Sequence, residues 1–159
     1  MDIADLVMPD SFVQGSGAAP DFYVVGLQEM VDLEVIGSII CAKDKERMVQ
    51  WESIVGSGLK KRTGQVYGCL LRKVMFGCFV MLFVRQDNFK YISNMHSVKT
   101  QTGTKGLTAN KGSTAIRFNF HDTSFMFMNC HLTSGQKKIK ERISDMDHNL
   151  EETLNYFVN

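Results

Sequence analysis

Four small groups of polar residues stand out in this 159-residue chain, because each follows or interrupts an apolar run. A carboxylate at the end of a strand can hold Mg²⁺, a hard cation that prefers oxygen ligands and keeps several waters. A lysine among small residues offers a phosphate a point charge and nearby backbone N–H groups. Together, such residues are suited to metal-assisted hydrolysis of a phosphate ester. The four groups are Gln28-Glu29, Thr108 to Gly112 (TANKG), Asn129 with His131, and Arg142 with Asp145.

The histidine group closes the apolar run FMFMNCHL, which begins at Phe125. Successive side chains of a strand point to opposite faces, so Asn129 and His131 share one face. From that face both side chains could donate hydrogen bonds to negative charge that develops on a phosphate. A strand that only packed a core would need no imidazole at its tip.

Each group also has a simpler structural explanation when it is taken alone. Glu29 could be a solvated loop carboxylate, or a residue of a first helical turn, where the helix dipole favours acids. The triplet 110–112 (NKG) is a common turn sequence. His131 could be a hydrogen-bonded residue at the rim of the core, and Arg142 with Asp145 a weak surface ion pair. The residues favour phosphate chemistry only as a set.

The elements that must hold these groups follow from the spacing of apolar residues. Apolar runs rich in β-branched and aromatic residues predict strands, whereas apolar residues three and four apart predict helices. In this interpretation Arg72-Lys73 separates two strands, and the strand that ends near His131 is covered on both faces. We expect strands at 21–30, 65–71, 75–85, 91–98, 113–120 and 124–132, and helices at 43–62 and 137–157. The order indicates a mixed α/β domain with helices packed on a largely β interior.

Both predicted helices carry an apolar stripe of the kind that packs on a sheet. The short connector 121–123 suits a hairpin between the last two strands. The stripes are Met48, Trp51, Val55 and Leu59 in the first helix, and Ile139, Ile143, Met146, Leu150, Leu154 and Phe157 in the last.

The bulk composition excludes several classes of protein. A hydrophobic content of 44% and a charged content of 22% are those of a soluble globular domain. A net charge of +1 gives no general attraction to nucleic acid or anionic lipid, so any anion must bind at a local patch. The four cysteines form no C-x-x-C pair, which favours reduced thiols and a cytoplasmic location. The N-terminus has no basic segment of a secretory signal, and the longest apolar run, 74–84, is too short to span a bilayer.

Four segments carry a resemblance to a known family: PDFYVVGLQEMVDL, FGCFVMLFVR, VKTQTGTKGLTANKGSTAIRFNFHDTSFMFMNCHLTSGQ and KERISD. In this order they resemble the inositol polyphosphate 5-phosphatases, in particular the catalytic domain of synaptojanin-like members of the endonuclease/exonuclease/phosphatase superfamily. The resemblance covers about 20–154, and its most specific part runs from Val98 to Asp145. It implies a four-layered α/β/β/α sandwich, with residues 1–159 forming the central part of a catalytic domain that is incomplete at both ends.

The resemblance also implies roles for single residues. Glu29 matches the glutamate that binds Mg²⁺ in the family. Asn110 and Lys111 match a loop that contacts the substrate phosphate. His131 matches a histidine at a strand end that faces the scissile phosphate and stabilises its transition state, which makes it the candidate catalytic residue.

For three further residues the resemblance implies only a supporting role. Asn129 shares the face of the catalytic histidine, and Arg142 and Asp145 are expected to fix the loop that follows it. One departure concerns the phosphate loop, where Ala109 replaces a usual glycine and could strain a position that needs a positive φ.

The implied reaction removes the 5-phosphate from a phosphoinositide lipid or a soluble inositol polyphosphate, with Mg²⁺ as cofactor. A cytoplasmic location with peripheral membrane contact follows from these substrates, and no nucleic acid partner is expected because the chain has no basic stripe. We expect a metal-binding asparagine of the family to precede Met1, and its W-x-G-D-x-N and Asp-His segments to follow Asn159. The chain alone is then expected to be inactive. The alternative function is that of a catalytically inactive relative that binds phosphoinositides or a protein.

Overall fold

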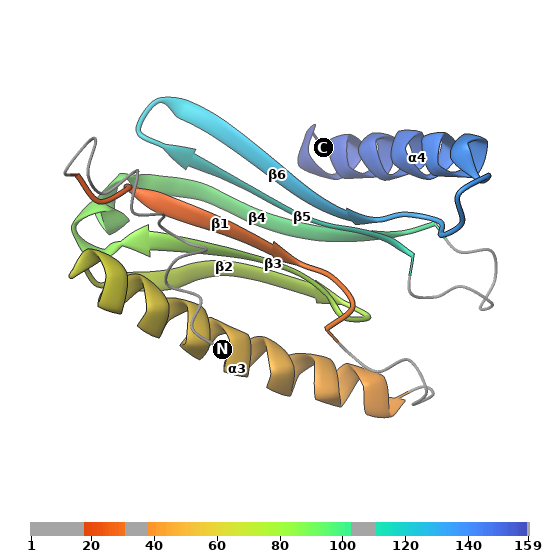
Figure 1. The fold of residues 1–159 in the computed structure, drawn as a ribbon. Helices are drawn as coiled ribbons and strands as arrows, with labels where there is room; N and C mark the ends of the chain where they lie inside the picture. Colours follow the sequence, from red (N-terminus) through yellow and green to blue (C-terminus); the bar gives the residue numbers. More distant parts are fainter. Residues whose placement is uncertain (1–17, 31–37, 103–110, 159) are drawn as a thin grey trace.

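Figure 1 shows the computed structural model, which describes residues 18–30, 38–102 and 111–158. Side chains of the first helix are described from Lys45 onward. The described elements are β1 (Phe22–Leu27), α3 (Ser38–Thr63), β2 (Tyr67–Met75), β3 (Cys78–Arg85), the 3-10 helix η1 (Gln86–Tyr91), β4 (Ile92–Gln101), β5 (Gly112–Phe120), β6 (Thr123–His131) and α4 (Ile139–Val158). No helix among these elements combines the length and apolar character that a membrane span requires.

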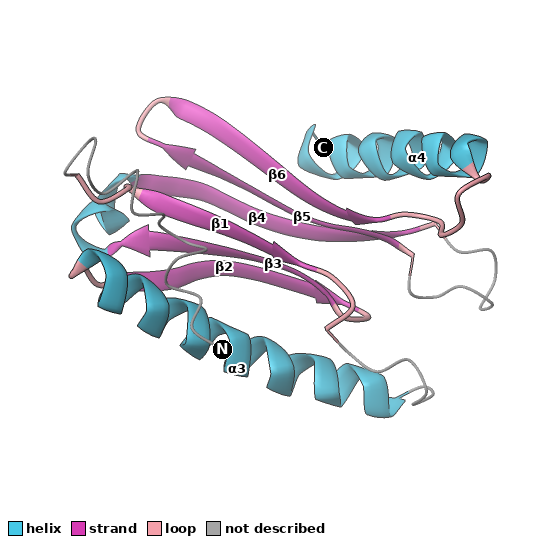
Figure 2. Ribbon diagram, viewed as in Figure 1, coloured by secondary structure: helices cyan, strands magenta, loops and turns pink. Residues whose placement is uncertain are grey.

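The described strands form two antiparallel sheets of three strands each. Sheet A has the order β1-β3-β2, and sheet B has the order β4-β5-β6. The sheets stack face to face, with α3 on the outer side of sheet A and α4 on the outer side of sheet B (Figures 1 and 2). The predicted four-layered α/β/β/α sandwich is therefore confirmed for the described part of the chain.

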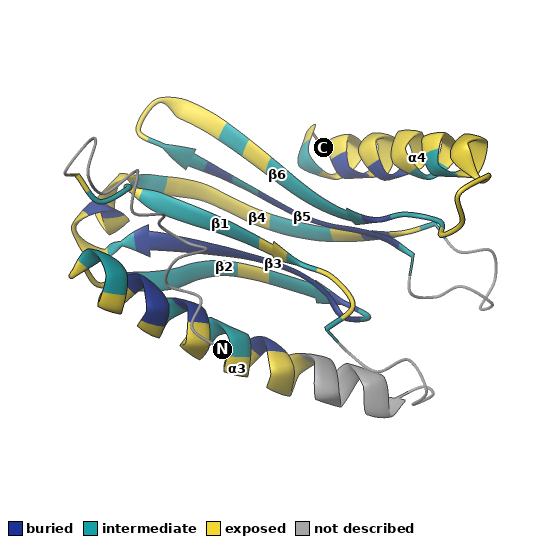
Figure 3. Ribbon diagram, viewed as in Figure 1, coloured by how far each residue is buried: buried dark blue, intermediate teal, exposed yellow. Residues whose placement is uncertain are grey.

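Strand β3 is the centre of the fold, and its residues Cys78 to Val84 are all buried (Figure 3). Alternate side chains of this strand enter two different cores. One core lies between the sheets and consists of Val80, Leu82, Val84, Ile116 and Phe118. The other lies between sheet A and α3 and consists of Val55, Leu59, Tyr67, Met81 and Phe83. A strand with apolar cores on both sides needs a continuous apolar sequence, and CFVMLFV provides one.

The prediction that Arg72-Lys73 separates two strands is wrong, because β2 continues to Met75. The turn lies at Phe76 and Gly77, which have positive φ values of 44° and 74°. The two basic side chains bond instead to neighbouring layers. The Arg72 guanidinium donates to the Glu52 carboxylate of α3 at 2.5 Å, and Lys73 Nζ donates to the Ser97 carbonyl of β4 at 3.4 Å.

Helix α4 lies where the sequence predicts it, but most of its apolar stripe is exposed to solvent. Asn149 and Thr153 are fully buried, whereas five stripe residues are exposed: Ile139, Ile143, Met146, Leu150 and Leu154. The expected cover on both faces of β6 is accordingly incomplete. Met126 on the outer face of β6 is 38% exposed, and Cys130 meets α4 through a 3.8 Å contact between its Sγ and Met146 Sδ.

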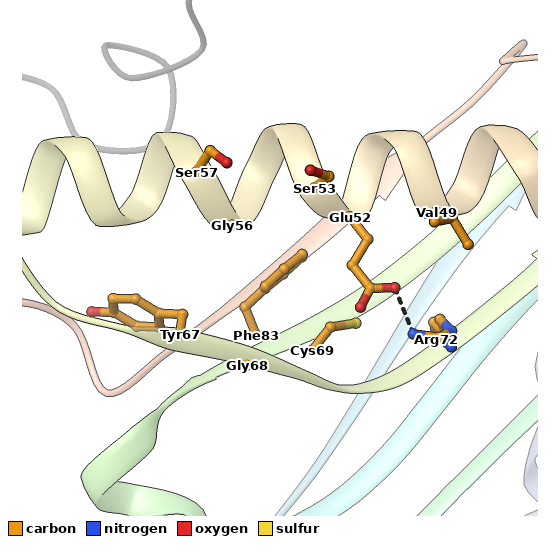
Figure 4. A pocket seen from close by; sticks show the side chains of 10 residues that line it. All are labelled: Val49, Glu52, Ser53, Gly56, Ser57, Tyr67, Gly68, Cys69, Arg72 and Phe83. Carbon is orange, nitrogen blue, oxygen red and sulfur yellow. Dashed lines mark hydrogen bonds and ion pairs between the residues drawn. The ribbon is translucent and has the colours of Figure 1, made fainter.

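An open cavity of about 500 Å³ lies between α3 and β2 (Figure 4). Small residues of the helix, Ser53, Gly56 and Ser57, leave this space unfilled. Cys69 of β2 lines it, and burial raises the pKa of this thiol to about 11. Burial likewise raises the pKa of Cys130 to about 11. Among the described residues, Cys69, Cys78 and Cys130 form no disulfide.

The raised pKa values predict slow alkylation of the folded chain. Cysteine reacts as the thiolate, and a rise from 9.0 to about 11 leaves about 100-fold less thiolate at pH 8. We expect iodoacetamide at pH 8 to modify Cys69 and Cys130 at least about 100-fold more slowly in buffer than in denaturing urea. The native rate should rise with pH up to about 11, as measured by mass spectrometry. Equal rates in buffer and urea at pH 8 would contradict the assigned burial.

Replacing Gly112 with alanine should destabilise the fold. Gly112 has a φ of 144°, and a Cβ there would lie 2.0 Å from the Thr100 carbonyl oxygen. We expect a loss of about 2–4 kcal/mol in the free energy of unfolding, measured by urea denaturation. Gly64→Ala is the matched control, because Gly64 has a φ of 70° with no atom within 4 Å of the added Cβ. The control should lose about 1 kcal/mol from backbone strain alone, and equal losses would show that the close approach is not decisive.

Candidate active site

The pairing of β5 with β6 brings two predicted site residues together. Gly112, the first residue of β5, is paired with His131, the last residue of β6. Lys111 immediately precedes Gly112, and its Nζ lies 2.8 Å from His131 Nε2. Two residues that are twenty positions apart in sequence therefore meet because of the hairpin register.

The third predicted residue comes from the other sheet. Glu29 follows the C-terminal end of β1, and its Oε1 lies 3.4 Å from His131 Nε2. The Glu29 side chain is 75% exposed, whereas that of His131 is 8% exposed. The carboxylate is thus open to a ligand from solvent, and the imidazole stands behind it at the edge of the core.

The short contact to Lys111 determines which ring nitrogen of His131 carries hydrogen. A lysine ammonium can only donate, so Nε2 of the neutral imidazole accepts this bond and Nδ1 carries the hydrogen. His131 Nδ1 is buried and has no hydrogen-bond partner among the described residues. Nε2 is therefore the ring nitrogen that faces both Lys111 and Glu29.

The backbone around Glu29 is held in an unusual conformation. Glu29 has a φ of 57°, in the left-handed region that few residues other than glycine adopt. The next residue is fixed on both sides: Met30 N donates to the Gly77 carbonyl at 3.1 Å, and the Arg47 guanidinium donates to the Met30 carbonyl at 2.6 Å. Gly77 and Arg47 belong to none of the predicted polar groups, because both bond to the backbone of Met30 from distant parts of the sequence.

Asn129 lies on the expected face but does not have the expected partner. Its Nδ2 donates to the carbonyl oxygens of Leu27 at 2.9 Å and Phe79 at 2.8 Å. Both amide hydrogens are therefore used within the protein, and none is left for a phosphate. The expected supporting role of Asn129 at the site stays a prediction. The residue joins the two sheets.

The predicted support for the loop after His131 has a clear geometry. The Asp145 carboxylate accepts a hydrogen bond from the Thr133 backbone N–H at 2.8 Å. The Arg142 guanidinium donates to the carbonyls of Gly135 at 2.6 Å and Thr133 at 3.5 Å. Both α4 side chains thus bond to the backbone of the loop that follows His131, which a simple surface ion pair would not do. Gly135 supplies a φ of 110° where the chain turns toward the helix.

Two further predictions concern Asn110 and the bound metal. Asn110 lies outside the described residues. For the metal, the described residues contain no group of three or more His, Cys, Asp or Glu side chains that could hold an ion. Mg²⁺ does not require such a cage, because it commonly binds through one or two carboxylates with waters and phosphate oxygens. The exposed Glu29 carboxylate fits that mode of binding.

Known proteins resemble this chain over most of its length. The family described as Endonuclease/Exonuclease/phosphatase family 2 matches residues 2–156. Polyphosphatidylinositol phosphatase INP53 of Saccharomyces cerevisiae is 36% identical over 136 residues, which make up 86% of this chain and 12% of that protein. Synaptojanin-2 of Rattus norvegicus is 36% identical over 134 residues, or 83% of this chain and 9% of that protein.

A solved structure agrees with the fold. It is the inositol polyphosphate 5-phosphatase domain of SPsynaptojanin in complex with inositol (1,4)-bisphosphate and calcium ion. The TM-score is 0.69 at 28% sequence identity, and the match covers 89% of this chain and 40% of that chain. This chain thus spans less than half of the solved domain and about a tenth of the two curated relatives. On its sequence and its two-sheet sandwich, the chain belongs to the endonuclease/exonuclease/phosphatase family 2.

Proposed function

We propose that this chain supplies part of the active site of an inositol polyphosphate 5-phosphatase. The observation that carries the proposal is the convergence of Glu29, Lys111 and His131 from three separate strand ends. Lys111 Nζ lies 2.8 Å and Glu29 Oε1 lies 3.4 Å from His131 Nε2, and charged contacts of this kind beside solvent contribute little to stability. The names of the relatives support the same activity, since they include a polyphosphatidylinositol phosphatase and a 5-phosphatase domain bound to inositol (1,4)-bisphosphate.

The three side chains divide the work of phosphate-ester hydrolysis. Lys111 donates its ammonium hydrogens to an oxygen of the substrate phosphate, which neutralises charge and orients the ester. The imidazole of His131 stabilises charge that develops on the phosphate in the transition state. Glu29 would hold Mg²⁺, which supplies Lewis-acid activation of the phosphoryl oxygen when it is bound.

The contact between Lys111 and His131 also suits an exchange of partners. Before substrate binds, the lysine donates to His131 Nε2. An incoming phosphate offers a stronger, charged acceptor, so the ammonium turns to the phosphate oxygen. Nε2 is then free to take up a proton from water, and the resulting N–H can donate a hydrogen bond to the same phosphate. The lysine thereby keeps the buried imidazole hydrogen-bonded until substrate replaces it.

The proposed substrates are phosphoinositide lipids or soluble inositol polyphosphates, with a cytoplasmic location and peripheral contact with membranes. The exposed edge supports this proposal, because the Glu29 carboxylate is open to solvent and could reach a headgroup at a lipid surface. We propose no nucleic acid partner, since the net charge is +1. The second candidate, a relative that binds inositides without hydrolysis, would use the same phosphate-binding residues.

The test of activity uses a chimera in which residues 20–154 replace the matching segment of the solved synaptojanin domain. In this chimera Glu29→Gln and His131→Ala should each lower kcat for release of the 5-phosphate by about 100-fold or more. The reasons are lost metal binding in the first variant and lost charge stabilisation in the second. Phosphate release from a 4,5-bisphosphorylated inositide is measured at several Mg²⁺ concentrations.

Glu46→Gln and His148→Ala are matched controls, because both residues are exposed on helices and contact none of the three site residues. Both should retain the kcat of the unsubstituted chimera within about twofold, as surface changes usually do. A folded chimera that binds inositides without hydrolysing them would favour the inactive relative. Near-normal kcat in Glu29→Gln or His131→Ala would overturn the assigned roles.

Lys111 should act mainly on substrate binding. Lys111→Met removes the ammonium that meets the phosphate, so we expect KM for the inositide to rise about tenfold, with a smaller fall in kcat. The effect should shrink as salt concentration increases, because added ions screen the charge. Lys60→Met, on the exposed end of α3, is the control and should leave KM unchanged. A normal KM for Lys111→Met would exclude this lysine from the phosphate site.

A further inference from the structure

The side chain of Asn129 crosses from one sheet to the other. It originates on β6 of sheet B, and its Nδ2 donates to Leu27 of β1 and Phe79 of β3, both in sheet A. The carbonyl oxygens that accept these bonds are backbone atoms, so they move together with the strands of sheet A. The side chain therefore fixes sheet B against sheet A at one point.

A glycine makes room for this crossing. Gly26 of β1 lies beneath the Asn129 side chain, and a Cβ at Gly26 would lie 3.2 Å from Asn129 Cγ. A contact of that length is tighter than nine in ten real Cβ contacts, so with a side chain at this position the asparagine would have to shift by a few tenths of an ångström. The backbone of Gly26 itself has an ordinary strand conformation. Its small size, not its flexibility, is what the contact requires.

Gln28 completes the connection in the opposite direction. Its Nε2 donates to Asn129 Oδ1 at 2.9 Å and to the Cys130 carbonyl at 2.8 Å. Gln28 immediately precedes Glu29, and Cys130 immediately precedes His131. The glutamine thus ties together the two backbone positions next to the candidate metal ligand and the candidate catalytic residue.

We propose that Gly26, Gln28 and Asn129 form an inter-sheet clasp that positions Glu29 against His131. The catalytic role of this clasp rests on the proposed function, whereas its hydrogen bonds do not depend on that proposal. Apolar packing between the sheets is non-directional and tolerates small shifts, whereas hydrogen bonds fix both distance and angle. Catalytic groups need to be held within about 0.5 Å of the productive geometry. The clasp provides the directional bonds that the apolar core lacks. Gln28 and Asn129 are positioning residues in this proposal.

The first test measures the Glu29–His131 contact in the full 159-residue chain, without metal or substrate. In the unsubstituted chain, NMR should show nuclear Overhauser effects between the Glu29 side chain and the His131 ring, whose polar atoms lie 3.4 Å apart. Gln28→Met keeps the length of the side chain but removes both hydrogen bonds, so these effects should weaken or disappear. Gln28 is exposed, so the variant should still fold.

Two further variants separate positioning from general stability. Gly26→Ala should weaken the same signals, because the added Cβ displaces Asn129. Val55→Ala is the control: it removes buried methyl groups from the core on the α3 side and should lower Tm by several degrees. The control should leave the Glu29–His131 signals intact. Unchanged signals in a folded Gln28→Met chain, or equal losses in Gln28→Met and Val55→Ala, would overturn the clasp.

Turnover in the chimera then connects the clasp with catalysis. Gln28→Met should lower kcat by about tenfold while KM stays within about twofold, since a small misplacement of catalytic groups slows the reaction more than it weakens binding. Val55→Ala should leave kcat within about twofold below its Tm. Loss of the NMR contact together with unchanged kcat would overturn the positioning role. An inactive unsubstituted chimera would overturn the proposed 5-phosphatase instead, while the NMR result would still decide whether the clasp exists.

Discussion

The pairing between Gly112 and His131 is the contact on which the candidate site depends. On its other side Gly112 pairs with Gln101 of β4, and this strand approaches so closely that a Cβ at Gly112 would lie 2.0 Å from the Thr100 carbonyl oxygen. Because Lys111 immediately precedes Gly112, this register places its side chain next to the imidazole of His131. A shift of one residue in the pairing would turn the histidine to the other face of the sheet. The ammonium and the imidazole therefore meet because of backbone geometry.

The two ends of the sandwich are held together by different forces. At the end away from the site, Phe22 of β1 packs edge-on against Phe118 and Phe125 of sheet B, with ring centroids 5.3 Å apart in each pair. Aromatic pairs of this kind add stability beyond their buried area. At the site end, the amides of Gln28 and Asn129 replace the aromatic rings. Polar groups there can meet water and ligand, which a fully aromatic interface would exclude.

Much of this arrangement could be predicted from the sequence. The continuous apolar run of β3 and the alternation in β5 gave the correct elements, since burial on two faces or on one leaves a direct pattern in the residues. The convergence of Glu29, Lys111 and His131 was suggested by residue type and by resemblance, and the structure places the carboxylate and the ammonium 3.4 Å and 2.8 Å from His131 Nε2. The roles of these residues remain predictions.

Other features could not be predicted, because they depend on contacts between distant parts of the chain. The turn at Phe76-Gly77 was missed, since Arg72-Lys73 is the more polar pair, yet both basic side chains find partners in neighbouring layers. The face that α4 presents to sheet B was also not evident. Periodicity identified an apolar stripe, but the outer face of β5 carries Ser113 and Arg117, and the helix meets it with polar residues.

A site divided between two sheets responds to any change in how the sheets pack. Glu29 follows β1 of sheet A, whereas Lys111 precedes β5 and His131 ends β6 of sheet B, so the distance between carboxylate and imidazole depends on the packing of the layers. Within sheet B, by contrast, the ammonium and the imidazole are tied through one ladder of backbone hydrogen bonds. Disturbing the interface between the sheets should therefore separate Glu29 from His131 before it separates Lys111 from His131. The hydrogen bonds from Asn129 to two backbone carbonyls of sheet A lie at this end of the interface, so they oppose that separation directly.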